Sequence, residues 1–404
     1  MPDASPLPIQ RKAAPPDQAA LAAEVRAAFA AKTPIYPVGG GTALAYGLPA
    51  KEPGIGLSTS QLTQIVDYPA RDMTITVEAG VTMATLAATL AAEGQQLPID
   101  VPFPEQATIG GVIATNWSGP RRFGHGTIRD YVIGISAVDG RGVPFKAGGR
   151  VVKNVAGYDF CKLLTGSLGT LAVITQVTLK VKPIPEATAW VVCDLNGVAC
   201  AEGFCEALSQ SQATPVAIEL NGGPFWQDNV QMAIGVEGTA AEVAWILERL
   251  AAERQEKGFG ELSVHDITAT ADVGAKRQTL TDFAATVEAP LVVRMNVLPS
   301  RLGTVLTQLE RNAGKSSFQS QAGNGIVNLA FHDVAPADVS RLILKDLQPM
   351  AVKAGGNVIV LSCPGQELTR QLTWGNGRGD RAVMLAVKQQ FDPAGILNPG
   401  RFVY

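Results

Sequence analysis

The run of residues 105–119, EQATIGGVIATNWSG, replaces bulky side chains with small and hydrogen-bonding ones in an otherwise apolar segment. Gly110 and Gly111 let a backbone approach a flat or charged group closely and expose N–H donors. Hydroxyl and amide groups are added by Thr108, Thr115, Asn116 and Ser118. Within this run no carboxylate or His follows Glu105, so its composition favours holding a neutral or anionic cofactor over attacking a substrate. A buried strand and turn packed against neighbouring backbone is the alternative.

Two further loops of small residues flank this run. A short strand, residues 35–38, leads into Gly-Gly-Gly-Thr at 39–42, and Gly-Ser-Leu-Gly-Thr follows at 166–170. Consecutive glycines permit a turn whose N–H groups point the same way and bind phosphate oxygens. The first loop fits neither G-x-G-x-x-G nor G-x-x-x-x-G-K-[ST], because Leu48 and Pro49 soon follow and no such Lys is present. A Rossmann fold and a P-loop are therefore disfavoured.

These segments together resemble a known family. Residues 105–119 resemble the flavin-contacting segment of the vanillyl-alcohol-oxidase, or PCMH-type, FAD-binding domains, and residues 39–42 resemble that family's pyrophosphate loop. Residues 149–159, GRVVKNVAGYD, followed by KLL at 162–164 and GSLGTL at 166–171, are similar to the FAD-binding E subunits of bacterial glycolate oxidases. The resemblance is dense over 33–183 and returns in FDPAGILNPGRF at 391–402.

The resemblance implies FAD as the cofactor. Some family members attach FAD through a His in the glycine loop, but Thr42 occupies that place here, so we expect non-covalent binding. The expected cofactor-binding residues are Val38, Gly39, Gly40, Gly41, Thr42, Gly47, Thr108, Ile109, Gly110, Gly111, Asn116, Ser118, Gly119, Gly169, Val173, Ile174 and Asn398. Catalytic residues stay unassigned, and no metal site is expected.

The expected fold class is α+β in more than one domain. A chain of 404 residues exceeds what one core usually fills. We expect an N-terminal lead and helix at 1–32, a two-subdomain PCMH-type FAD-binding domain at 33–185, an α+β cap domain with an antiparallel sheet at 186–372, and a segment at 373–404 that returns to the FAD domain.

Local patterns predict the elements within these ranges. Apolar spacing predicts a helix from Asp17 to Lys32, with Asp17 as its cap. Residues 171–181 read as an edge-like strand closed by Pro183. Beyond 189, the order strand, helix, strand, strand, helix, strand occurs twice, the second time from 291 to 361 with one helix at 336–353. Two βαββαβ units predict one antiparallel sheet backed by helices.

Composition excludes several functions. A net charge of -3 with no dense Lys/Arg run argues against nucleic acid as a partner. No apolar span approaches about 20 residues, which argues against direct membrane insertion. The N-terminus lacks a secretory pattern, and five cysteines without a C-x-x-C pair suggest reduced thiols. We expect a cytoplasmic protein, with any membrane association provided by partners.

The sequence shows only some of the groups that oxidation of a hydroxy acid needs. Oxidation needs a base for the hydroxyl proton and a cation for the carboxylate, and metal-assisted relatives supply a cluster of His and acidic residues. The histidines here are His125, read as an exposed loop residue, and His265 and His332, read as structural. No iron–sulfur cysteine pattern is present.

By the resemblance, the chain is the FAD-binding subunit of a glycolate oxidase (glycolate dehydrogenase) complex, with a catalytic FAD subunit and an iron–sulfur subunit as partners. The complex oxidises glycolate to glyoxylate and passes electrons through flavin to the iron–sulfur partner. One alternative is a self-sufficient FAD-dependent 2-hydroxy-acid or polyol dehydrogenase, which requires Arg294, Arg378 or His332 to face the flavin. The other is a flavin-free scaffold.

Overall fold

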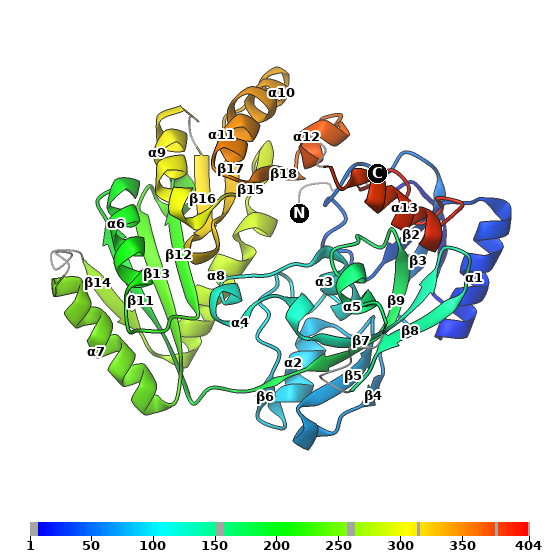
Figure 1. The fold of residues 1–404 in the computed structure, drawn as a ribbon, viewed down its shortest axis with the longest axis horizontal. Coiled ribbons are helices and arrows are strands. Elements are labelled where there is room, and N and C mark those ends of the chain that lie inside the picture. Colours follow the sequence, from blue (N-terminus) through cyan, green and yellow to red (C-terminus); the bar gives the residue numbers. More distant parts are fainter. Residues whose placement is uncertain (1–6, 151–156, 257–262, 313–315, 376–378, 403–404) are drawn as a thin grey trace. The chain divides into compact units, whose positions relative to one another are not determined.

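The computed structural model describes residues 7–150, 157–256, 263–312, 316–375 and 379–402 (Figure 1). Part of the 149–159 motif, and Arg378, lie outside these ranges. The chain forms two compact units. Among the described residues, the first unit contains 7–118, 127–184 and 379–402, and the second contains 119–126 and 185–375. The expected ranges differ in placing 119–126 inside the FAD-binding domain and 1–32 outside it.

A small parallel sheet and one helix begin the first unit. The carboxylate of Asp17 accepts a hydrogen bond from the Ala20 N–H at 2.8 Å, so α1 (Gln18–Ala31) begins where the sequence predicts. The sheet has the order β1 (Ile9–Ala13), β3 (Gly54–Ser58), β2 (Ile35–Val38). The expected lead therefore contains a strand, which pairs in parallel with β3.

A five-stranded antiparallel sheet is the largest sheet of this unit. Its order is β4 (Ile65–Asp67), β5 (Thr74–Glu78), β9 (Ala172–Lys180), β7 (Val132–Asp139), β8 (Pro144–Gly148). The prediction of an edge strand at 171–181 is wrong, because β9 pairs with β5 on one side and β7 on the other. The polar residues that alternate along β9 therefore lie on one face of the sheet and do not mark an unpaired edge. The remaining elements are α2 (Met83–Ala91), β6 (Gln95–Gln96), α3 (Ile109–Thr115), α5 (Phe160–Leu164), β10 (Lys182–Pro183) and α13 (Arg381–Phe391).

The second unit is built on one eight-stranded antiparallel sheet. Its order is β14 (Val264–Ile267), β11 (Ala187–Leu195), β13 (Val230–Gly238), β12 (Ala217–Gly222), β16 (Ser316–Gln321), β17 (Ile326–Phe331), β15 (Leu291–Asn296), β18 (Asn357–Ser362). Each half of the sheet has four strands, and outward from the β12–β16 pair these are the second, third, first and fourth of that half in chain order. The two predicted βαββαβ units are therefore confirmed as equivalent halves of one sheet.

Helices cover both faces of this sheet. One apolar core joins a sheet face to α6 (Val198–Ser209), α7 (Ala240–Glu256), α9 (Leu302–Asn312) and α11 (Gln348–Lys353). A smaller core joins Trp190 and Val192 on the other face to α8 (Thr270–Thr286) (Figure 1). The single helix expected at 336–353 is confirmed in extent, since these residues are helical without interruption, but its type changes, with a 3₁₀ turn at Pro336–Asp338 and a π-helical turn at Leu342–Leu347. Pro349 has no N–H to donate into this turn, which explains the change in helix type.

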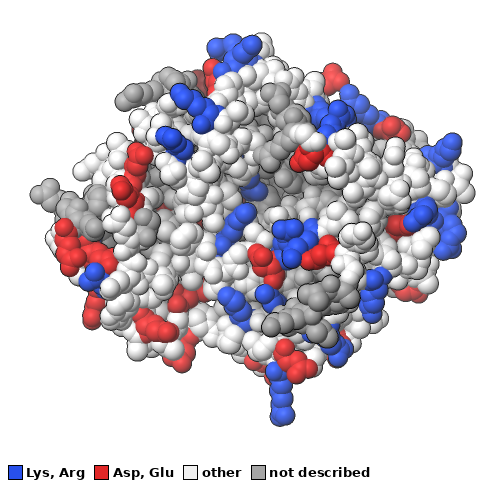
Figure 2. Space-filling model, viewed as in Figure 1, with Lys and Arg blue, Asp and Glu red and all other residues white. Residues whose placement is uncertain are grey.

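Charged side chains of both signs are interspersed on the face shown in Figure 2. Within the described residues, no helix combines the length and apolar content needed to cross a membrane.

Candidate cofactor site

Two of the predicted segments of the first unit meet at the start of α3. Thr108 is the N-cap of α3, and its hydroxyl accepts from the Gly111 N–H at 3.4 Å. The glycine loop at 39–42 lies directly against this cap. A Cβ atom on Gly39 would be 2.2 Å from Thr108 Oγ1, and one on Gly40 would be 1.7 Å from the Gln106 carbonyl oxygen. Only glycine permits so close an approach of the two segments.

The glycine loop has the features of an anion-binding turn. Gly40 and Gly41 are exposed, and Gly41 has a φ of +75°. Among the described residues, the N–H groups of Gly40, Gly41 and Thr42 donate to no acceptor. Successive unpaired N–H groups in a glycine turn are suited to phosphate oxygens.

Gly110 lies in close contact with Ala79, which follows β5. Its N–H is not available to a ligand, because it donates to the Ala79 carbonyl at 2.9 Å. A Cβ on Gly110 would be 2.8 Å from Ala79 Cβ, whereas one on Gly111 would have only Thr108 Oγ1 nearby, at 3.3 Å. Gly110 therefore lets α3 pack beside the end of β5, and Gly111 is the glycine of this pair with fewer close neighbours.

A pair of variants tests this distinction. Gly110→Val is expected to destabilise the first unit by about 1–3 kcal/mol, because the added side chain overlaps Ala79. Gly111→Val is expected to keep an apo-protein of nearly wild-type stability but to lower its flavin content. Thermal unfolding of the apo-proteins and the ratio of flavin to protein absorbance give the two readouts. Normal flavin content in a folded Gly111→Val protein would contradict the assignment.

The third predicted segment meets α3 at its other end. Asn116 caps this end with a φ of +52°. The loop at 166–170 is held here, because the Leu168 N–H donates to the Ala114 carbonyl at 2.8 Å and the Gly166 N–H donates to the Ile113 carbonyl at 2.9 Å. Helix α3 therefore has the glycine loop at its start and the 166–170 loop at its end.

The C-terminal segment returns to this region, as the resemblance implies. The Asn398 N–H donates to the Ile35 carbonyl at 2.8 Å, and its side-chain amide donates to the Leu168 carbonyl at 2.6 Å. Arg401 donates to the carbonyls of Leu44 and Tyr46 at 2.6 and 2.7 Å. Asn398 and Arg401 are 9% and 6% exposed, so this segment is not a surface turn. Burial lowers the pKa of Arg401.

Three buried oxygen atoms in this region lack partners among the described residues. They are Asn116 Oδ1, Ser167 Oγ and Asn398 Oδ1. A buried polar atom without a hydrogen bond costs roughly 1–3 kcal/mol, so these three oxygens are suited to accept hydrogen bonds from a ligand or from ordered water. Sequence reasoning missed Ser167, although it lies inside the quoted Gly-Ser-Leu-Gly run.

The other expected residues occupy varied positions. Val173 and Ile174 bury their side chains in two apolar cores, so only their backbone is available to a ligand. Gly47 has a φ of +100° and follows the loop that Arg401 holds. Val38 ends β2, and Ile109 is a core residue. Ser118 is buried in the first unit, whereas Gly119 belongs to the second.

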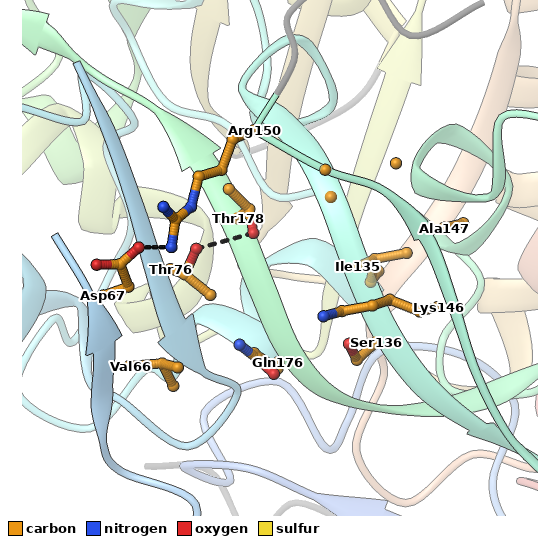
Figure 3. A pocket seen from close by; sticks show the side chains of 13 residues that line it. Val66, Asp67, Thr76, Ile135, Ser136, Lys146, Ala147, Arg150, Gln176 and Thr178 are labelled. Atoms are coloured by element: carbon orange, nitrogen blue, oxygen red, sulfur yellow. Dashed lines mark hydrogen bonds and ion pairs between the residues drawn. The ribbon is translucent and has the colours of Figure 1, made fainter. Parts of the chain in front are cut away.

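A separate hollow of about 310 Å³ lies on the outer face of the five-stranded sheet (Figure 3). Its polar lining residues are Asp67, Thr76, Ser136, Lys146, Arg150, Gln176 and Thr178. Figure 3 shows the Arg150–Asp67 ion pair near the hydrogen bond that joins Thr76 and Thr178, which is 3.0 Å long. The hollow contains none of the expected cofactor-binding residues, so it is distinct from the site around α3.

The second unit carries a row of polar side chains in register across six strands. Successive paired residues are Asp194, Gln231, Asn221, Gln319, Asn328 and Arg294. Arg294 Nε donates to Asn328 Oδ1 at 3.0 Å, and Asn328 Nδ2 donates to Gln319 Oε1 at 2.6 Å. Gln319 in turn donates to the buried carboxylate of Glu219. Because a guanidinium only donates and a carboxylate only accepts, this chain fixes the orientation of both amides between them.

The histidines are placed as follows. His332 Nε2 shares a 2.8 Å hydrogen bond with Ser317 Oγ, and His265 lies in β14, paired with β11. The expectation that His125 is an exposed loop residue is wrong, because its side chain is 12% exposed and its Nε2 lies 2.8 Å from Glu237 Oε2. No group of three His, Cys, Asp or Glu residues in the described part of the chain could hold a metal ion.

Comparison with known proteins agrees with this arrangement. A family model for the FAD binding domain matches residues 9–148, and one for the C-terminal domain of FAD linked oxidases matches residues 207–402. The two matches span more than four fifths of the chain. This chain belongs to the FAD-linked oxidases. It is an FAD-dependent oxidoreductase, and its cofactor is FAD. The unpartnered N–H groups and oxygens around α3 fit such a cofactor.

Individual relatives cover the chain to different extents. Glycolate oxidase subunit GlcE of Escherichia coli is 38% identical over 170 residues, 42% of this chain and 48% of that protein. Glycolate oxidase subunit GlcD of Bacillus subtilis is 25% identical over 92% of this chain and 84% of its own. A D-lactate dehydrogenase of Anaerostipes hadrus is 27% identical over 95% of this chain and 87% of its own.

A solved structure shows the same fold. Alkyldihydroxyacetonephosphate synthase has a TM-score of 0.70 at 17% identity, over 96% of this chain and 76% of that one. The PCMH-type α+β fold is therefore confirmed.

Proposed function

We propose that this chain is the FAD-binding subunit of a glycolate oxidase complex, which oxidises glycolate or a closely related 2-hydroxy acid. The observation that carries this proposal is the 38% identity to subunit GlcE over 170 residues. The proposed partners are a catalytic FAD subunit and an iron–sulfur subunit, and the proposed location is the cytoplasm. Bound FAD supplies the two-electron acceptor for oxidation of the hydroxyl-bearing carbon.

In this proposal, the residues around α3 hold the cofactor. The N–H groups of Gly40, Gly41 and Thr42 bind its phosphates, since they are unpaired and two of the three residues are exposed. The unpartnered oxygens of Asn116, Ser167 and Asn398 accept hydrogen bonds from its hydroxyl or N–H groups. The other residues assigned from the sequence contribute backbone and close packing. Thr42 offers no nucleophile comparable to a His, so binding is non-covalent.

A self-sufficient 2-hydroxy-acid dehydrogenase is the second candidate. It is favoured by similarity to GlcD and to D-lactate dehydrogenase over nearly the whole chain. This reading requires a cation for the substrate carboxylate. Arg294 is the described arginine among the residues named from the sequence, and its Nε already donates to Asn328. Arg378 lies outside the described residues, and His332 is already engaged with Ser317.

Anaerobic reduction of the isolated chain distinguishes the two candidates. The purified protein is expected to be yellow, with absorption in roughly the 350–500 nm range of flavins. Glycolate, D-lactate and acetate are then added without oxygen, with acetate as the control that has no hydroxyl to oxidise. We expect no bleaching with any of the three, because the chain needs its catalytic partner. Bleaching by glycolate or D-lactate alone would support the self-sufficient enzyme and contradict the subunit proposal.

A further inference from the structure

A buried ammonium joins three segments of the first unit. Lys388 lies on α13, and its side chain is 12% exposed. Its Nζ donates to the Thr170 carbonyl at 2.6 Å, to Asp392 Oδ2 at 2.6 Å and to the Leu397 carbonyl at 3.0 Å. An ammonium carries three N–H donors, and these acceptors come from three different stretches of chain. The loop before β9, the end of α13 and the C-terminal segment are therefore all hydrogen-bonded to the same nitrogen.

The carboxylate partner of Lys388 is equally engaged. The Asp392 side chain is 0% exposed and accepts from the Ile396 N–H at 3.1 Å and the Leu397 N–H at 2.7 Å. A Cβ on Gly140 would be 2.5 Å from Asp392 Oδ1, so the β7–β8 turn packs directly on this carboxylate. Burial lowers the pKa of Lys388, an effect that the charge of Asp392 opposes. Burying an ion pair costs desolvation free energy, and the hydrogen bonds that Lys388 and Asp392 make to the backbone offset this cost.

The segments that Lys388 joins are those next to the cofactor site. Leu397 precedes Asn398, and Thr170 follows Gly169. Asn398 Nδ2 would lie 3.3 Å from a Cβ on Gly169, so the two residues are in close contact. Asn398 also has a φ of +43°, and its Oδ1 is buried without a partner among the described residues. Small movements of either segment would therefore redirect this free oxygen.

We propose that Lys388 is a positioning residue for FAD. It does not itself contact the cofactor. Its nitrogen binds the Thr170 and Leu397 carbonyls together and so holds the 166–170 loop against the C-terminal segment. This contact fixes the position of Asn398 Oδ1 relative to Gly169. This role follows from the contacts of α13 and does not depend on which substrate the enzyme oxidises.

The test compares FAD affinity with stability. Lys388→Met alone leaves the Asp392 charge buried and unpaired, so the main variant is Lys388→Met/Asp392→Asn, which removes both charges. Lys388→Arg keeps the charge but replaces one nitrogen by a planar fork. Lys353→Met, at an exposed lysine of the second unit, is the control. For each protein, the Kd for added FAD and the Tm of the apo and FAD-loaded forms are measured.

We expect the double variant to bind FAD at least about tenfold more weakly. The rise in Tm on adding FAD should shrink, because ligand stabilisation depends on the ratio of concentration to Kd. Lys388→Arg should show a smaller loss, and the control none. A purely structural pair would lower the Tm of apo and loaded forms equally. An unchanged Kd, in whichever of the two Lys388 variants folds, would overturn the proposal.

Discussion

Gly40→Ala is expected to yield a protein that retains roughly a tenth or less of the wild-type flavin, a loss equivalent to more than about 1.4 kcal/mol of binding free energy. The added Cβ would stand 1.7 Å from the Gln106 carbonyl oxygen and 2.5 Å from its carbon. These are backbone atoms beside the Thr108 cap of α3, so they cannot move aside as a side chain can. The glycine loop must therefore shift, and its unpaired N–H groups shift with it.

The matched control for this variant is Gly149→Ala. A Cβ at Gly149 has nothing within 4 Å, and the residue does not have a positive φ. It lies in the same unit, beside the hollow on the outer sheet face. Flavin content is measured from the absorbance ratio after purification, and apo-protein folding is checked by circular dichroism. Full flavin retention in Gly40→Ala would show that the 39–42 loop does not hold the cofactor.

Much of the fold could be predicted because local patterns determine single elements. A carboxylate at the right offset fixed the start of α1, and apolar alternation revealed the repeated strand and helix order of the second unit. The position of β9 could not be predicted in this way. Its polar alternate residues are compatible with either an edge or a face, and only pairing with β5 and β7, far away in sequence, decides between them.

The cofactor site was predictable where it consists of glycine loops, and less so where it depends on contacts between distant segments. The role of Gly110 is decided by Ala79, which no local pattern connects to it. Lys388 and Arg401 act on backbone carbonyls, and carbonyls carry no signature in a sequence. The partner of His125 is 112 residues away. Side chains of this kind are recognisable only once the chain is folded.

Glu237→Gln is expected to destabilise the second unit by about 3 kcal/mol at pH 7. Arg121 Nη1 lies 3.1 Å from one oxygen of Glu237 and His125 Nε2 lies 2.8 Å from the other, and the Glu237 side chain is 5% exposed. Burial alone would raise the pKa of Glu237, but the hydrogen bond from His125 and the charge of Arg121 outweigh it and lower the pKa to about 2. The variant also removes the negative charge of Glu237 that lies beside Arg121.

The pH dependence of this difference follows from the direction of the shift. A carboxyl whose pKa is lowered by folding contributes its full stability above its ordinary value of 4.5, and this contribution is lost as the pH falls toward 2. The gap in unfolding free energy between wild type and Glu237→Gln should therefore be largest near neutral pH and narrow below about 4.5.

Urea unfolding at several pH values measures this gap through tryptophan fluorescence. Four of the five tryptophans lie in the second unit, so the signal reports mainly on it. Glu288→Gln, at an exposed carboxylate, is the control and should show little change. If the gap between wild type and Glu237→Gln stays constant from pH 7 to pH 3, then the Glu237 carboxylate does not act as the ionised anchor that holds residues 119–126 to the sheet of the second unit.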